Sequence, residues 1–309
     1  MPLLAVMTGP DLGGHATLGE AWLAVRSVLR STRLETADLD ARLLVANIAG
    51  VEPHQLTIAG ETPLPPTVRD RLEKALQDRL DGMPVHRILG AREFYGLRLG
   101  LSPATLEPRP DTETLIEAVL PLVREKVVAK GTCSIVDLGI GTGAIGLALL
   151  AECPEAHCLG VDVSPEAVAT ALENAEALGL GRRYSAIEGD WLSGVETRFD
   201  LIVSNPPYIP TADLASLSRE VVDHDPMLAL DGGSDGLDAY RIIAAQSEDR
   251  LEDEGYLALE IGIGQSQSVS ALFAAKGFVR TGVFADLGGV DRVLLFKSRA
   301  MQMRGKQGI

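Results

Sequence analysis

The residues most suggestive of chemistry form one tetrapeptide, which consists of Asn205, Pro206, Pro207 and Tyr208. It follows an apolar run at 201–203 that is typical of a buried strand. Neither proline can donate a ladder hydrogen bond, and the residue before a proline is pushed toward extended backbone, so the strand must end here. We therefore expect a stiff strand exit that points an amide and an aromatic ring outward. Such a pair could clamp a planar group that carries a nitrogen.

A glycine-rich loop forms a second candidate site. It consists of Gly139, Ile140, Gly141, Thr142 and Gly143, and it directly follows an apolar run at 134–138. Glycines allow a tight turn and a close backbone approach to a ligand at the N-terminus of the following helix. Asp162 ends the next predicted strand, 23 positions after Gly139, close to the ~20-residue spacing at which a carboxylate meets ribose hydroxyls. The pairing predicts a nucleoside-binding site.

The nucleoside is expected to carry no phosphate. Counted from Gly139, the phosphate-binding pattern GxGxxG is not met, since Ala144 stands where the third glycine would be. S-adenosylmethionine, whose product is S-adenosylhomocysteine, fits such a loop better than a dinucleotide does. Asp190 and Trp191 follow the third predicted strand, where the ring could stack on an adenine and the carboxylate could accept from its amino group.

Two of these assignments have structural alternatives. Trp191 could simply be buried in the core, as large aromatic residues often are. Asp137, which stands just before the loop, is expected to orient the glycine turn rather than to act as a catalyst.

Together the two sites suggest methyl transfer to an amide or an exocyclic amine. The nitrogen lone pair of such a group is delocalised, so the protein must favour positive charge on that nitrogen. The side-chain oxygen of Asn205 and the carbonyl of Pro206 could accept hydrogen bonds from both N–H groups and hold the nitrogen near the methyl carbon. Tyr208 would pack against the flat group. No general base is expected if a cationic nitrogen forms first and loses its proton afterwards.

The elements that must position these residues alternate in type from residue 134 onward, which predicts a doubly wound α/β domain. The predicted strands are 134–138, 157–161, 184–188, 201–204, 256–261, 279–284 and 292–296. The predicted helices are 144–152, 165–178, 238–251 and 266–276. Ligands of open α/β sheets bind at the carboxyl ends of the strands, so both candidate sites should face one crevice.

The part before this domain predicts a different organisation, with residues 1–17 as a flexible N-terminus and residues 18–83 as a helical domain. Thr36 is expected to cap a helix that ends at Gly50. The helical domain carries no evident chemistry and is expected to pack or to dock a partner. Residues 84–107 are predicted to be a β-hairpin linker with strands at 88–89 and 94–99. Residues 108–298 form the α/β domain, and residues 299–309 form a C-terminal tail.

Composition limits the classes of function. The net charge of −15 argues against a nucleic-acid partner, which usually requires a basic face. No segment approaches the ~18 continuous apolar residues of a membrane span, and the first twenty residues contain no Lys or Arg, so no targeting signal is expected. The three cysteines form no CxxC pair and are expected to be reduced thiols. The expectation is a cytoplasmic protein, a monomer, without a metal site.

The chain resembles a known family. Residues 205–208 match the motif of amino-directed, S-adenosylmethionine-dependent methyltransferases, and the whole chain is similar to the HemK-type N5-glutamine methyltransferases of peptide chain release factors. The segments that carry the resemblance are 92–97, 108–113, 139–143, 205–208, 225–226, 229–233, 235–237 and 260–262, with Gln265. The resemblance covers almost everything from the helical domain to about Lys297.

The resemblance implies an N-terminal helical bundle, a hairpin linker and a Rossmann-like, seven-stranded methyltransferase domain. It implies methylation of the glutamine in the Gly-Gly-Gln motif of class 1 release factors, which tunes translation termination. By position, residues 139–143, Asp162 and Trp191 resemble the cofactor contacts. Residues 205–208 resemble the glutamine clamp, with Asn205 also near the methionine end of the cofactor. Residues 108–113 resemble a stretch that flanks the active site, or else they only start a helix with Asp111 or Thr112 as its cap.

Some residues depart from the family pattern. Ile140 replaces a usual Thr, Asp225 stands where Glu is commoner, and residues 83–88 lack a usual Tyr. The alternatives that remain are a ribosomal-protein glutamine methyltransferase and an adenine-N6 or cytosine-N4 DNA methyltransferase, which would need a basic groove. A non-enzymatic nucleoside-binding scaffold is disfavoured because both sites are complete.

Overall fold

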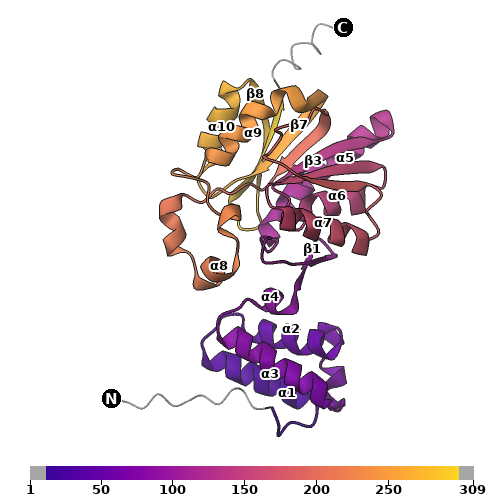
Figure 1. Cartoon of the computed structure of the whole chain (residues 1–309), viewed down its shortest axis with the longest axis vertical. Coiled ribbons are helices and arrows are strands. Elements are labelled where there is room, and N and C mark those ends of the chain that lie inside the picture. Colours follow the sequence, from indigo (N-terminus) through magenta and orange to yellow (C-terminus); the bar gives the residue numbers. More distant parts are fainter. Residues whose placement is uncertain (1–11, 299–309) are drawn as a thin grey trace. The chain divides into compact units, whose positions relative to one another are not determined.

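The structure is a computed structural model that describes residues 12–298 of the 309-residue chain (Figure 1). The chain divides into two compact units, Met1–Gly90 and Ala91–Ile309. The predicted C-terminal tail, 299–309, and residues 1–11 of the predicted flexible N-terminus lie outside the described residues. Within residues 12–298, no helix is long and apolar enough to cross a membrane.

The first unit is helical over its described residues. Its helices are α1 (Leu18–Ser31), α2 (Ala37–Ala49), α3 (Pro66–Leu80) and α4 (Val85–Leu89), with short 3-10 turns η1 (Pro53–Gln55) and η2 (Ile58–Glu61). Thr17 and Glu20 form a capping box at the start of α1, in which each side chain accepts from the other residue's backbone N–H. Gly50 ends α2 in the left-handed conformation, with φ 73°.

Three expectations for this unit are corrected. The Thr36 side chain does not cap α2, because its hydroxyl donates to Asp40 Oδ2 instead (3.1 Å). Residues 88–89 are not a strand: they belong to α4, which Gly90 ends at φ 67°. Leu12, inside the predicted flexible terminus, is buried, and its N–H donates to Glu73 Oε1 at 2.8 Å. A contact with another element explains only the third correction, and the first two are decided within the helix concerned or at its end.

A two-stranded hairpin opens the second unit. Strands β1 (Ala91–Phe94) and β2 (Leu97–Gly100) pair antiparallel around Tyr95 and Gly96, which both have positive φ (49° and 73°). This backbone suits a tight two-residue turn. The side-chain amide of Asn174 holds the end of β2, since its Oδ1 accepts from Gly100 N–H (2.7 Å) and its Nδ2 donates to Gly100 O (3.1 Å).

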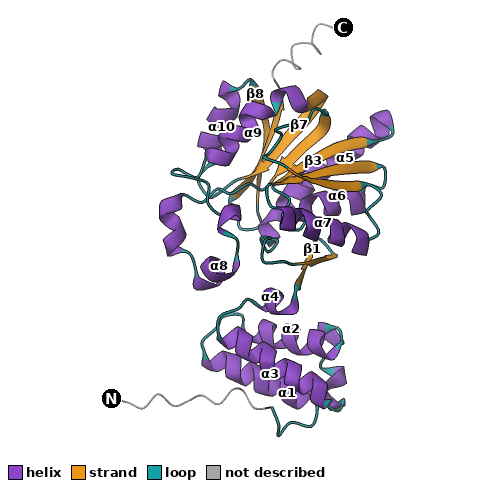
Figure 2. Cartoon of the chain, viewed as in Figure 1, coloured by secondary structure: helices purple, strands orange, loops and turns teal. Residues whose placement is uncertain are grey.

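A seven-stranded sheet forms the centre of the second unit, with strand order β5-β4-β3-β6-β7-β9-β8 (Figure 2). Its strands are β3 (Cys133–Leu138), β4 (Ala156–Asp162), β5 (Tyr184–Glu188), β6 (Phe199–Ser204), β7 (Leu251–Glu260), β8 (Phe278–Ala285) and β9 (Asp291–Ser298). The first five strands in this order pair in parallel, and β9 is antiparallel to both β7 and β8. The predicted α/β class and its seven strands are confirmed.

Helices cover both faces of this sheet. They are α5 (Glu113–Lys130), α6 (Ala144–Glu152), α7 (Pro165–Ala177), α9 (Asp238–Gln246) and α10 (Ser266–Ala275). The connections contain α8 (Arg219–His224), which has no buried residue, and the 3-10 turns η3 (Pro110–Thr112), η4 (Thr211–Ser216), η5 (Met227–Ala229) and η6 (Glu248–Arg250). One apolar core contains side chains of α5, α6 and α7, and the other contains side chains of α9 and α10. The predicted helix 238–251 is shorter than expected, because β7 already starts at Leu251.

The register of the central strands brings the two candidate sites together. Leu138 pairs with Ser204 across β3 and β6, and the Ser204 hydroxyl donates to Leu138 O at 2.7 Å. The glycine loop therefore follows the end of β3, and the 205–208 motif follows the end of the adjacent strand β6, at the same edge of the sheet. Val161 on the other side of β3 and Leu259 beside β6 lie at this level too, so Asp162 and Glu260 end at the same edge of the sheet.

A buried ion pair in the helical unit gives a first prediction. Arg79 Nε lies 2.7 Å from Asp40 Oδ2, and both side chains are under 5% exposed. The substitution Asp40→Ala leaves a buried guanidinium without its carboxylate, so we expect the unit to lose about 3–5 kcal/mol of its free energy of unfolding. Hydrogen exchange of the α1–α3 amides, read by mass spectrometry, measures this loss. The control is Asp38→Ala, because Asp38 lies on α2 like Asp40 but forms an exposed ion pair, with Arg30. Equal protection of the amides in the two variants would contradict the prediction.

Candidate active site

The glycine loop has a backbone that only glycine adopts readily. Gly139, Gly141 and Gly143 have φ values of 71°, 52° and 80°, in the left-handed region. A Cβ on Gly143 would also lie 3.0 Å from the Tyr184 hydroxyl. Between them, Ile140 and Thr142 are buried. These two predicted cofactor contacts can therefore offer a ligand their backbone, whereas their side chains fill the core.

Asp162 braces this loop, in the place that the spacing predicts. Its Oδ2 accepts from Gly141 N–H at 3.0 Å, and its Oδ1 accepts from Ser164 N–H at 2.9 Å. The adjacent backbone adds a bond from Gly139 N–H to Val161 O at 2.8 Å. A carboxylate oxygen has two lone pairs, so each oxygen of Asp162 retains one that can accept from a ribose hydroxyl.

Asp137 lies below the loop, fully buried. Its Oδ2 accepts from Gly146 N–H at 3.0 Å, which ties the first turn of α6 to the end of β3. Burial raises the pKa of Asp137 to about 7, and the hydrogen bond from Gly146 opposes this rise. The carboxyl thus has the orienting position that the sequence predicts, and it faces the helix rather than the surface.

The structure places Trp191 over the loop. Its ring lies 3.7 Å from the point that a Cβ on Gly139 would occupy, and the residue has a positive φ of 55°. The ring is half-buried and packs against the second core as well, as the core interpretation of Trp191 expects. Stacking of this ring on an adenine stays a prediction. Asp190 is exposed, and only its backbone carbonyl is held, by Ser193 N–H at 3.0 Å.

These residues fit S-adenosylmethionine by their chemistry. The loop offers a backbone without side chains at Gly139 and Gly141, and any side chain on Gly139 would enter the space beside the Trp191 ring. A carboxylate suits ribose hydroxyls, and an aromatic ring suits an adenine. The residues that would hold the cofactor are thus the glycine loop, Asp162 and Trp191.

In the 205–208 motif, Asn205 has a defined amide orientation. Its Nδ2 donates to Thr112 Oγ1 at 3.1 Å, so its Oδ1 is the atom left for a ligand. Within residues 12–298 no group donates to this oxygen. Pro206 is buried behind the half-buried Asn205. The motif therefore presents a hydrogen-bond acceptor, as a clamp for an N–H group requires.

Tyr208 is held by its main chain. Its carbonyl accepts from Gln265 Nε2 at 2.9 Å, and Gln265 Oε1 accepts from Gly262 N–H at 2.9 Å. Burial and the nearby charge of Glu260 raise the pKa of Tyr208 to about 12, although Arg292 opposes the rise. The phenol is thus neutral at physiological pH and offers its ring rather than a base.

A glycine-rich segment, 230–236, forms backbone hydrogen bonds with Ile209, directly after the 205–208 motif. Ile209 N–H donates to Leu230 O (3.0 Å), and Gly232 N–H donates to Ile209 O (2.8 Å). A Cβ on Gly232 would lie 2.9 Å from Pro207 O, so this close approach requires glycine.

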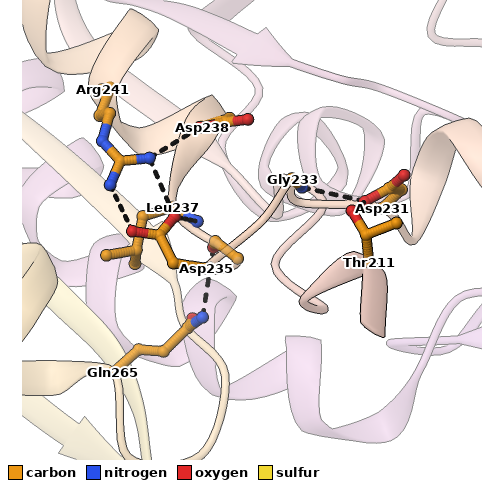
Figure 3. A network of polar contacts seen from close by, with 9 residues as sticks. Thr211, Asp231, Gly233, Asp235, Leu237, Asp238, Arg241 and Gln265 are labelled. Atoms are coloured by element: carbon orange, nitrogen blue, oxygen red, sulfur yellow. Dashed lines mark hydrogen bonds and ion pairs between the residues drawn. The ribbon is translucent and has the colours of Figure 1, made fainter. Parts of the chain in front are cut away.

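Polar side chains shape this segment, as Figure 3 shows. Asp231 Oδ1 accepts from the Thr211 hydroxyl (2.7 Å) and from Gly233 N–H (2.9 Å). Arg241 binds both Asp235 and Asp238. Of these residues, the sequence identified only Asp231, Gly233 and Asp235, through the resemblance, and the structure places their segment against Ile209.

The segment before α5 contributes to the site in a way the sequence did not predict. A helix does start here, at η3 and α5, but neither candidate cap makes a side-chain cap bond. Thr112 turns its hydroxyl to Asn205, and Asp111 Oδ2 lies 2.9 Å from Arg292 Nη2. Nearby, Arg109 Nη2 lies 2.6 Å from Asp225 Oδ2, which connects this segment to the end of α8.

Glu260 is a residue of this site to which the sequence analysis gave no role, although it lies in a segment that carries the resemblance. It ends β7, beside the strand that carries Asn205, and it is 1% exposed. Burial raises the pKa of Glu260 to about 7, while hydrogen bonds from the side chains of Thr112 and Asn205 and the charge of Arg292 lower it. A signal was available: an acidic residue that ends an apolar strand at the ligand-binding edge of the sheet.

Comparisons with known proteins agree with this geometry. The family model of the methyltransferase small domain matches residues 118–234, and that of the PrmC N-terminal domain matches residues 20–90. The fold is similar to the catalytic domain of hMettl16 in complex with the MAT2A 3'UTR hairpin 6, with a TM-score of 0.51 at 16% identity over 76% of this chain and 82% of that one. The chain is therefore an enzyme of the S-adenosylmethionine-dependent methyltransferase class.

The sequence relatives narrow this class. The chain is 47% identical over 285 residues to the release factor glutamine methyltransferase of Agrobacterium fabrum, covering 92% of this chain and 99% of that relative. It is 45% identical to the enzyme of the same name from Rhodospirillum rubrum, over 93% of this chain and 89% of the relative. The chain belongs to the release factor glutamine methyltransferase family, and the expected family is confirmed.

The brace at Asp162 gives a second prediction. Asp162→Ala removes the acceptor that holds the loop at Gly141, the acceptor of Ser164 N–H and the carboxylate that would face the ribose, so we expect S-adenosylhomocysteine to bind roughly 10- to 100-fold more weakly. Isothermal titration calorimetry with this product measures the effect. Glu173→Gln, an exposed change on α7, serves as the control, and equal affinities for the two variants would contradict the role of Asp162.

Proposed function

We propose that this enzyme transfers the methyl group of S-adenosylmethionine to the side-chain amide nitrogen, N5, of the glutamine in the Gly-Gly-Gln motif of class 1 peptide chain release factors. The modification would tune translation termination. The observation that carries the proposal is the orientation of Asn205, whose Nδ2 is held by Thr112 so that Oδ1 can accept from a substrate N–H. The names of the curated relatives support the choice of substrate.

The residues of the motif act on a substrate amide in distinct ways. When bound, S-adenosylmethionine supplies an electrophilic methyl group. Asn205 Oδ1 and the Pro206 carbonyl accept from the two amide N–H groups, which aims the nitrogen and stabilises the positive charge that develops on it. Pro207 stiffens the clamp, and the Tyr208 ring packs on the flat amide. Asn205 would contact the methionine end of the cofactor by its oxygen or its backbone, since Nδ2 already donates to Thr112.

The remaining residue assignments belong to this proposal. The glycine loop, Asp162 and Trp191 would hold the cofactor, and the exposed Asp190 side chain would accept from the adenine amino group. Residues 18–83 would dock the release factor, residues 84–107 would act as a linker, and residues 108–298 would carry the catalysis. We further propose that the enzyme works as a cytoplasmic monomer.

Substrate choice can be tested directly. The enzyme is incubated with methyl-labelled S-adenosylmethionine and, in separate reactions, with a class 1 release factor, ribosomal proteins or duplex DNA. The proposal expects label on the glutamine of the release factor, and none on a release factor in which that glutamine is replaced by alanine. Label confined to ribosomal protein or to DNA would reject it.

Asn205 gives the prediction for catalysis. Asn205→Ala removes the acceptor that the transition state needs, so turnover on the release factor should fall by about 100-fold or more. Binding of S-adenosylhomocysteine, measured by calorimetry, should change much less. A variant that binds the product poorly but turns over normally at saturation would reverse this assignment.

A further inference from the structure

The side chain of Asn205 belongs to a small buried network of three residues. Its Nδ2 donates to Thr112 Oγ1 at 3.1 Å. The Glu260 carboxyl group lies within reach of both side chains, because hydrogen bonding from Thr112 and Asn205 lowers its pKa. Since Nδ2 has two hydrogens, it can serve both partners, and the hydroxyl of Thr112 is free to donate to the carboxyl. The network connects three segments that are far apart in the sequence.

Glu260 lies deep in this network, and its carboxyl is only partly used. The residue is 1% exposed, and its Oε2 is buried without a hydrogen-bond partner among the described residues. Its main chain is fixed separately, because its carbonyl accepts from the Tyr240 hydroxyl at 3.0 Å. A buried carboxyl without full pairing is costly. A hydrophobic residue would fill the end of β7 at a lower cost in folding free energy, so packing alone does not explain a carboxyl group here.

We infer that Glu260 is a positioning residue for methyl transfer, which holds the amide of Asn205 and polarises its oxygen toward the substrate N–H. This inference rests on the proposed function, because it assigns a further residue to the same clamp. Thr112 is the second member of the device, since it fixes the amide plane from the other side.

The physical effect is selective for the transition state. A carboxylate that accepts from Nδ2 shifts electron density in the Asn205 amide toward Oδ1, which strengthens a hydrogen bond to that oxygen. The substrate N–H becomes more acidic as its nitrogen gains the methyl group and positive charge. The bond from that N–H to Asn205 therefore strengthens more in the transition state than in the ground state, and only such a difference raises the rate.

The protonation state of Glu260 decides whether this effect is present. The pKa of Glu260 is about 7, raised by burial. Asp111 raises this pKa further, and Arg292 lowers it. Tyr208, which also faces the carboxyl, is neutral, because its own pKa is about 12. As the pH rises through about 7, Glu260 loses its proton and gains the charge that polarises Asn205. Turnover should rise over the same range.

Glu260→Gln tests this inference in kinetics, since glutamine keeps the shape and an acceptor but never carries charge. With the release factor at saturation, kcat should fall roughly 10- to 100-fold, and the rise of kcat near pH 7 should disappear. Binding of S-adenosylhomocysteine should be unchanged. Glu254→Gln, an exposed change on the same strand, is the matched control. If Glu260→Gln retains the wild-type rise near pH 7, whatever its rate, the inference is wrong.

A pair of Thr112 variants tests the second member. Thr112→Ser keeps the hydroxyl and should retain wild-type kcat within about threefold, whereas Thr112→Val keeps the shape without the hydroxyl and should lower kcat about tenfold. Thermal melting of both variants reports whether they fold. Equal kcat in two folded variants would overturn the role of the hydroxyl.

A measurement without substrate separates this inference from the proposed function. The 15N–1H signals of the Asn205 side-chain amide, assigned by their loss in Asn205→Ala, are followed in the free enzyme from about pH 5 to pH 9. They should titrate with a midpoint near 7 in the wild type and stay constant in Glu260→Gln. Signals that do not titrate in the wild type would overturn the inference. An unmethylated release factor together with a titrating Asn205 would reject the proposed function alone.

Discussion

The alignment of β3 with β6 is the constraint on which the site depends. Leu138 and Ser204 are paired partners in the parallel register, and the Ser204 hydroxyl locks that level by donating to Leu138 O at 2.7 Å. A shift by one residue would turn every side chain of β6 to the opposite face of the sheet. The glycine loop that would hold the methyl donor and the clamp that would hold the acceptor thus keep their separation because two buried strands cannot slip.

Carboxyl groups at the ends of three strands carry out the local positioning. Asp137 at the end of β3 holds α6, Asp162 at the end of β4 holds the glycine loop, and Glu260 at the end of β7 faces Asn205. Two of them are buried so deeply that the pKa of each rises to about 7. Buried carboxyl groups weaken a core unless they are well paired. At this edge of the sheet they hold backbone and side-chain groups in fixed orientations, although they lower the stability of the core.

The strands, the glycine loop and the position of Asp162 were predictable from the sequence. Runs of apolar residues, the glycine pattern and the spacing to Asp162 are all local features of the sequence. Two errors were decided by near neighbours. Thr36 is a residue type that often caps helices, yet its hydroxyl donates to Asp40, four positions later. Residues 88–89 are apolar like a strand, but they form a short helix that ends at Gly90. Glu260 is different: it lies in a segment that carried the resemblance but was given no role, because the residues around its carboxyl, Thr112 and Asn205, lie 148 and 55 positions earlier in the sequence.

The network around Asn205 also explains why the segment before α5 belongs with the active site. An asparagine amide that is free to rotate by 180° would present a donor half of the time and repel a substrate N–H. Thr112, at the start of α5, accepts from the Asn205 Nδ2. A Glu260 carboxylate can only accept, so from the end of β7 it favours the orientation that turns Nδ2 inward and Oδ1 outward. The two prolines restrict the backbone of the clamp, but they do not fix the orientation of the Asn205 side-chain amide. The chemistry therefore depends on three strand and helix ends that only the folded sheet assembles.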